Sequence, residues 1–115
     1  MDNQHKHIKG YRDLSQYEID LMNEIKAKGA ELLALQARLT GFLDTQWETK
    51  CADALRSLDR PEAAGVSIYV GATDECREFR RFNEAEPRRW ADIGKTDIQT
   101  DVMALVRAVA QPAGV

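Results

Sequence analysis

Apolar residues in the first half of the chain recur at steps of three and four positions, the spacing that gathers side chains on one face of an α-helix. The series is Ile19, Met22, Ile25, Gly29, Leu32, Leu33, Leu39, Leu43 and Trp47. Just before it, Ser15 and Glu18 have the spacing of a capping box. The pattern predicts one long amphipathic helix over residues 15–48, in a helical run that ends at Asp59-Arg60-Pro61.

Residues 60–73 form a connection between the two halves of the chain, and they contain Gly65 and Gly71. Within this connection, residues 66–70 alternate apolar with other side chains, which is typical of a short strand. A lone strand needs a partner, so this segment is either half of a hairpin between subunits or a plain loop.

Proline and glycine divide the second half into shorter predicted helices. Thr73 or Asp74 caps a helix that ends near Glu86, because Pro87 cannot continue it. Pro87 suits the first turn of the next helix, a short one over residues 88–93.

Gly94 is expected to close that short helix, and Thr96 or Asp97 to begin the last one. The apolar stripe of the last helix is Ile98, Val102, Leu105, Val106 and Val109, and the helix ends before Pro112. These patterns together predict an all-α chain.

The length of the first helix bears on assembly. A helix over residues 15–48 is about 50 Å long, whereas a compact globule of this chain length is only roughly 35 Å across. Either the helix kinks, with Gly29 and Gly41 as weak points where it bends or another backbone comes close, or a second subunit covers its apolar stripe. The scarcity of bulky core residues favours assembly.

Composition and charge exclude several classes of protein. The 115 residues suffice for one domain, and 43% of them are hydrophobic and 30% charged, as in a folded protein. Sixteen basic against nineteen acidic side chains give a net charge of -3, which argues against a protein that binds bulk nucleic acid. We expect no membrane span and no signal peptide, and therefore a cytosolic protein.

The residue types that carry catalysis or hold metals are sparse. Cys51 and Cys76 form no C-x-x-C pair and are expected to be small apolar fillers. His5 and His7 lack companions to complete a metal shell. The chain has no defensible catalytic triad and no H-E-x-x-H motif, so we expect no metal, no cofactor and binding instead of turnover.

Lys9, Tyr11 and Arg12 form the first candidate binding motif, because a tyrosine flanked by cations offers a stacking face for a base beside donors for a phosphate. The residue types alone favour a structural alternative, in which Tyr11 packs on the start of the helix.

Two further motifs lie nearer the C-terminus. Gly94-Lys95-Thr96 resembles the end of a P-loop, but the earlier glycine is missing and no buried strand precedes it, so an NTPase is not expected. The alternatives are an anion site at a helix N-terminus or a simple cap by Asp97.

The second motif is a set of arginines around Trp90, which either form a solvated, ion-paired face or stack on a base and contact a phosphate. The set is Arg77, Arg80, Arg81, Arg88 and Arg89.

Both ends of the chain resemble a known family. The run from Met1 to Gln16 and the stretch over residues 85–100 are similar to the small phage anti-CBASS sponge proteins of type 2, which are related in fold to an anti-Thoeris sponge family. The resemblance covers residues 1–26 and 83–112, whereas residues 49–80 are looser and longer than in the family.

The resemblance implies a fold, an assembly and an activity. The protomer would be a single helical domain over residues 1–115, with 60–73 as a variable connection, in which a long helix and the C-terminal helices form an antiparallel hairpin. Protomers would pair into dimers and then a hexamer, a trimer of dimers. The family captures cyclic dinucleotides between subunits and cyclic trinucleotides in separate pockets without cleaving them, so the protein would act in the host cytoplasm.

The resemblance also assigns residues. The stacking tyrosine of the family falls on Tyr11 and its phosphate-contacting lysine on Lys26, with Lys9 and Arg12 beside the tyrosine. Candidates for the second kind of pocket are Arg89, Lys95, Thr96 and Asp97. Capture of cyclic ADP-ribose-type Thoeris signals, a helical structural or adaptor subunit, and a nucleotide-cleaving enzyme are the alternatives.

Overall fold

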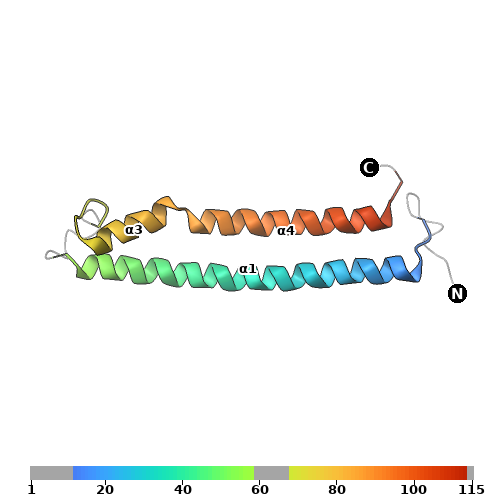
Figure 1. The fold of residues 1–115 in the computed structure, drawn as a ribbon, viewed down its shortest axis with the longest axis horizontal. Helices are drawn as coiled ribbons and strands as arrows, with labels where there is room; N and C mark the ends of the chain where they lie inside the picture. Colours follow the sequence, from blue (N-terminus) through green and yellow to red (C-terminus); the bar gives the residue numbers. More distant parts are fainter. Residues whose placement is uncertain (1–11, 59–67, 114–115) are drawn as a thin grey trace. The chain divides into compact units, whose positions relative to one another are not determined.

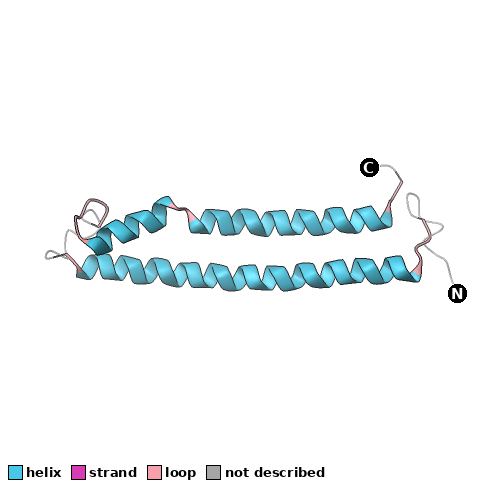
Figure 2. Ribbon diagram, in the orientation of Figure 1, coloured by secondary structure: helices cyan, strands magenta, loops and turns pink. Residues whose placement is uncertain are grey.

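The chain folds entirely into helices over the residues that the structure describes. The structure is a computed structural model that describes residues 12–58 and 68–113. Its helices are α1 (Gln16–Arg56), α3 (Asp74–Glu84) and α4 (Pro87–Ala110), and these two described ranges contain no strand (Figure 1, Figure 2). The prediction of an all-α protein is confirmed. Within the described ranges, no helix combines the length and the apolar character that crossing a membrane requires.

Two compact units make up the chain, and α1 and α4 contribute to both. We call Met1–Leu35 with Gly94–Val115 the terminal unit, and Gln36–Ile93 the central unit. In the terminal unit, the first part of α1 runs antiparallel to the second part of α4 (Figure 1). In the central unit, the rest of α1 lies beside α3 and the start of α4 (Figure 1). Each unit is therefore built on antiparallel helical segments.

The capping box forms as its spacing predicts. The Glu18 amide donates to Ser15 Oγ at 3.1 Å, and the Ser15 amide donates to Glu18 Oε1 at 2.9 Å. These two bonds satisfy amides that have no partner inside the first turn of a helix. The predicted helix thus starts at the expected place, and α1 continues past residue 48 to Arg56.

Gly29 marks a close approach between α1 and α4 in the terminal unit. A Cβ atom added at Gly29 would lie 2.5 Å from Val102 Cγ2, a distance that packed carbon atoms do not reach. Gly41 differs, because no described heavy atom lies within 4 Å of its added Cβ. The neighbour at Gly29 is thus a side chain and not the backbone that the sequence analysis considered, and only hydrogen leaves room for the valine.

A small apolar core holds the central unit together. Its buried members are Ala54, Ile68, Cys76 and Phe79, with Cys51, Leu55 and Leu58 packed against them. The helix α3 enters this core after Thr73, whose Oγ1 accepts a hydrogen bond from the Cys76 amide at 3.1 Å. Both the predicted cap at Thr73 and the role of the two cysteines as apolar fillers are confirmed.

The connection before α3 is a turn where the structure describes it. Residues 68–70 form a turn, which Arg80 holds by donating to the Ile68 carbonyl at 3.2 Å and to the Gly71 carbonyl at 2.8 Å. The short-strand alternative is therefore wrong for these three residues, and its first two positions, 66 and 67, lie outside the described residues.

The predicted helix break at Gly94 is wrong. The helix α4 runs without interruption from Pro87 to Ala110, so Thr96 and Asp97 lie inside it and cap nothing. A glycine inside a helix costs only about 1 kcal/mol relative to alanine, and the apolar stripe on both sides of Gly94 offsets that cost. The anion site expected at a helix N-terminus here is excluded too, because these amides belong to the interior of α4.

The contrast between the two glycines of α1 gives a matched pair of variants. We expect Gly29→Ala to lower the free energy of unfolding by about 1–3 kcal/mol, because the new methyl group overlaps Val102. Gly41→Ala should raise it by up to about 1 kcal/mol, because it adds helix propensity without a clash. Urea unfolding followed by circular dichroism, at one protein concentration, measures both. Equal effects of the two substitutions would contradict the close approach.

Candidate functional site

Some of the candidate ligand-binding residues lie within the described ranges of the chain, and others do not. Lys9 and Tyr11 lie outside the described residues. Arg12 is the first residue described, and its guanidinium contacts both Glu18 near the start of α1 and the last carbonyls of α4. Lys26 lies on α1 in the terminal unit and is exposed. The Lys26 ammonium forms no ion pair with any residue in 12–58 or 68–113.

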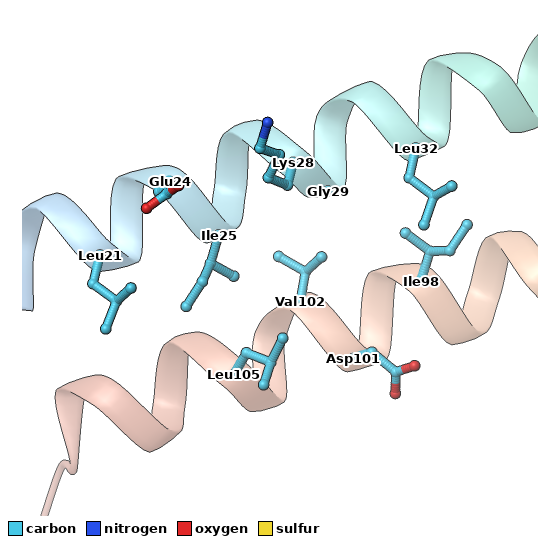
Figure 3. Close-up of a pocket in the computed structure, with 10 residues that line it drawn as sticks. All are labelled: Leu21, Glu24, Ile25, Lys28, Gly29, Leu32, Ile98, Asp101, Val102 and Leu105. Atoms are coloured by element: carbon cyan, nitrogen blue, oxygen red, sulfur yellow. The ribbon is translucent and has the colours of Figure 1, made fainter.

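A groove of about 390 Å³ runs between α1 and α4 in the terminal unit. In Figure 3, Ile25 and Leu32 of α1 point toward α4, and Val102 of α4 points back toward α1. The charged groups of Lys28 and Asp101 lie at its rim and point away from the space between the helices (Figure 3). The groove is therefore suited to apolar side chains and not to a phosphate.

A second cavity, of about 320 Å³, lies in the central unit and combines aromatic with charged side chains. Its lining residues are Leu43, Asp44, Trp47, Phe82, Asn83, Glu86, Pro87, Arg88 and Arg89. Trp47 Nε1 donates to Asn83 Oδ1 at 3.1 Å, and Arg88 pairs with Asp44 at 2.5 Å. These bonds join α1 to α3 and α4 and fix the walls of the cavity.

Arg89 stands at the edge of this cavity, beside Trp90. Its guanidinium carbon lies 5.1 Å from the centre of the Trp90 ring, and Nη1 lies 3.5 Å from Glu86 Oε2. The Trp90 side chain is 60% exposed, so one face of this cation and ring is open to solvent. The sequence-predicted pairing of an arginine with Trp90 is thus present in the structure.

Most of the other arginines in this set form the solvated, ion-paired face, the first of the two interpretations of this motif. Arg77 pairs with Asp74 at 2.6 Å, and Arg81 pairs with Glu78 at 2.6 Å. Exposed pairs of this kind add little to stability, and they leave few guanidinium groups open to a ligand. Arg89 differs from them because it also contacts an exposed ring.

Lys95, Thr96 and Asp97 lie together on consecutive positions of α4 and are exposed. They belong to the terminal unit, whereas Arg89 belongs to the central unit. Sequence reasoning missed Asp44, Trp47 and Asn83 as cavity residues. No sequence signal pointed to them, because Trp47 and Asn83 are 36 positions apart and each alone has an ordinary helical role.

Two carboxyl groups in the structure have strongly lowered pKa values. Arg12, and after it the Ser15 backbone amide, hold the pKa of Glu18 at about 2 instead of 4.5. Arg81, and after it Lys50, hold the pKa of Glu78 at about 2 instead of 4.5. In both cases hydrogen bonds and positive charge favour the ionised carboxylate. Both groups therefore remain ionised over the whole neutral range.

Comparison with known proteins identifies the chain as an all-helical hairpin protein. Residues 3–110 match the family model described as "Acb2/Tad1, hairpin domain", and the chain belongs to this family. It is 60% identical over 114 residues, which is 99% of both chains, to "Anti-CBASS protein 2" of Pseudomonas phage JBD67. This relationship confirms the resemblance to the anti-CBASS proteins of type 2. The alignment also includes the middle segment, so residues 49–80 are no insertion relative to that protein.

The lowered pKa of Glu18 predicts how stability changes with pH. A carboxylate with a depressed pKa stabilises the fold above its unfolded pKa of 4.5, and this contribution disappears as the pH falls to about 2. Glu18→Gln should therefore lower the Tm at neutral pH, and the gap to the unaltered protein should close between pH 4.5 and about 2. Thermal unfolding at stepwise lower pH measures this gap. A gap that persists below pH 2 would contradict the ionic role of Glu18.

Proposed function

We propose that this chain is a phage anti-CBASS protein that binds and sequesters cyclic di- and trinucleotide immune messengers without cleaving them. It acts in the host cytoplasm and keeps the messengers from the effector that they activate. The observation that carries this proposal is the 60% identity, over 99% of both chains, to a protein named for its anti-CBASS role. The whole chain, residues 1–115, acts as one sponge domain with a variable connection at 60–73.

Assembly is the first element of the proposal: protomers pair and then form a hexamer, a trimer of dimers. Large apolar side chains on both long helices support it, because they are exposed in the single chain. Leu35 is 53% exposed and Phe42 59% on α1, and Met103 is 71% exposed on α4. Large apolar side chains that are exposed in a single chain are typical of surfaces that contact other proteins. The apolar groove of the terminal unit gives a second chain a place to insert side chains.

A cyclic dinucleotide occupies the first kind of pocket, between subunits. Two-fold symmetry brings two copies of Tyr11 and Lys26 to a ligand that itself has two bases and two phosphates. The tyrosines stack on the bases, the Lys26 ammonium groups contact the phosphates, and Lys9 and Arg12 flank the tyrosines. The exposure of Lys26 and its lack of an ion pair with any described residue support this role.

A cyclic trinucleotide occupies the second kind of pocket, to which Arg89, Lys95, Thr96 and Asp97 contribute. The contact of Arg89 with the exposed Trp90 ring supports this assignment, because a cation beside an aromatic face suits a nucleotide. A sponge needs only a few such contacts for each ligand. A chain of net charge -3 can therefore bind a small anion tightly while it repels bulk nucleic acid.

The second candidate function is capture of cyclic ADP-ribose-type Thoeris signals, which the resemblance to an anti-Thoeris sponge family implies. Native mass spectrometry with a panel of cyclic dinucleotides, cyclic trinucleotides and cyclic ADP-ribose distinguishes the two, since it counts subunits and ligands together. We expect hexamers that carry cyclic di- and trinucleotides, and intact ligand after heat denaturation of the complex. Selective binding of cyclic ADP-ribose would favour the second candidate. Hydrolysed ligand would indicate an enzyme, and assembly without ligand would indicate a structural subunit.

Lys26 and Lys28 provide a matched pair of charge deletions on one helix. We expect Lys26→Ala to weaken cyclic dinucleotide binding by about 10- to 100-fold, because a charged hydrogen bond to phosphate is lost. Lys28→Ala removes the same charge from a residue that pairs only loosely with Glu31, at 3.8 Å, and should change the affinity less than about 3-fold. Tyr11→Ala should weaken cyclic dinucleotide binding by about as much as Lys26→Ala does. Isothermal titration measures the affinities and native mass spectrometry checks the assembly. Equal losses for both lysines would show a general charge effect and no specific contact.

A further inference from the structure

The Arg12 guanidinium has an acceptor for each of its five N–H groups. Nε donates to the Ala110 carbonyl at 3.1 Å, and Nη2 donates to the Val109 carbonyl at 2.8 Å and to Glu18 Oε2 at 2.5 Å. Nη1 donates to Glu18 Oε1 at 3.4 Å and to the Asp13 carbonyl at 3.3 Å. Five donors are all that a guanidinium offers. A phosphate that accepted a hydrogen bond from Arg12 would compete with these partners.

The partners of Arg12 are themselves fixed in place. Val109 and Ala110 are the last residues of α4, where carbonyls have no partner within the helix and the helix dipole favours a cation. Glu18 is held by its capping-box bonds to Ser15. Arg12 therefore ties the backbone before α1 to two rigid helix ends, and the Glu18 carboxylate balances its charge.

We propose that Arg12 is a positioning residue of the cyclic dinucleotide site, which anchors the backbone immediately after Tyr11 and does not contact the phosphate. This inference rests on the proposed function, in which Tyr11 stacks on a base. Tyr11 is joined to Arg12 by one peptide bond, so the anchor holds the residue that directly follows the tyrosine. A backbone that is fixed before the ligand arrives loses less conformational freedom on binding.

Glu18→Gln separates positioning from direct contact because the two roles predict changes of opposite sign. If Arg12 contacted a phosphate, removal of the negative charge beside it would strengthen binding of an anion. If Arg12 positions Tyr11, loss of the carboxylate releases the guanidinium and weakens binding. We expect about 10-fold weaker binding of a cyclic dinucleotide, measured with cyclic GMP–AMP and cyclic di-AMP as probes.

Arg12→Lys supports the same distinction, since lysine keeps the charge but lacks the planar fork. We expect it to weaken binding about as much as Glu18→Gln does, and the double variant to be no weaker than either single variant. Glu31→Gln is the control: it removes the same charge from α1 at an exposed residue, and should leave the affinity unchanged.

A measurement without ligand tests the anchor itself. Trypsin cleaves after arginine, and the bonded Arg12 side chain is a poor substrate while both helix ends hold it. We expect faster cleavage after Arg12 in Glu18→Gln than in Glu31→Gln. Thermal unfolding and native mass spectrometry check whether the variants are folded and assembled at the temperature of the binding measurement.

The outcomes are distinct. Weaker binding and faster cleavage in Glu18→Gln support the positioning role. Tighter or unchanged binding in Glu18→Gln, with binding by the unaltered protein intact, overturns it and leaves the proposed function standing. If the unaltered protein binds no cyclic nucleotide, the proposed function fails, and this inference fails with it.

Discussion

A pair of antiparallel helices can bury only the narrow stripe along which the helices touch, and this constraint governs the rest of the molecule. The buried apolar residues of the described chain are few: Ala54, Ile68, Cys76, Phe79, Phe82 and Ala91. All but one of the 24 residues of α4 are at least partly exposed, and Ala91 is the exception. Such a protomer gains little from burial of its own side chains. Its remaining stability has to come from helix ends, close backbone approaches and contacts with other copies.

Specific contacts accordingly stabilise the helix ends and the places where two helices approach closely. In the terminal unit, Gly29 lets Val102 pack directly on the backbone of α1, and Arg12 caps the last carbonyls of α4. In the central unit, Nε2 of the Gln36 side chain donates to the Ala91 carbonyl at 2.8 Å. Each contact joins two helices without a large apolar side chain. The larger apolar side chains of α1 and α4 consequently remain on the surface, where the proposed assembly uses them.

Sequence reasoning predicted the parts of the structure that depend on neighbours along the chain. The Ser15 and Glu18 cap and the Thr73 cap each join residues three positions apart, so spacing alone reveals them. The predicted break at Gly94 is wrong because glycine disfavours a helix by only about 1 kcal/mol. The apolar stripe that continues across Gly94 outweighs this local cost.

Contacts between distant residues left no such signal. Arg12 meets Val109 and Ala110 across 97 and 98 positions, and nothing near any of them indicates this meeting. The candidate site was therefore predicted by resemblance and by residue type, which identify a tyrosine or a cation but not its partners. The sequence therefore indicates Arg12 as a candidate for the ligand site, whereas only the structure shows its five hydrogen bonds within the chain.

The basic residues divide into those that hold the structure and those without an ion pair, and this division bears on ligand selection. Arg12 caps α4, Arg80 fixes the turn before α3, and Arg88 joins α4 to α1, while Lys50 joins α1 to α3 through Glu78 at 2.9 Å. Lys26 and Lys95, by contrast, have no ion pair with any described residue. An ammonium group on a flexible stem is a point charge that can follow a phosphate, whereas a bonded fork cannot move without loosening the fold. In the proposed cyclic dinucleotide site, Arg12 thus supplies rigidity and Lys26 supplies the contact with the ligand.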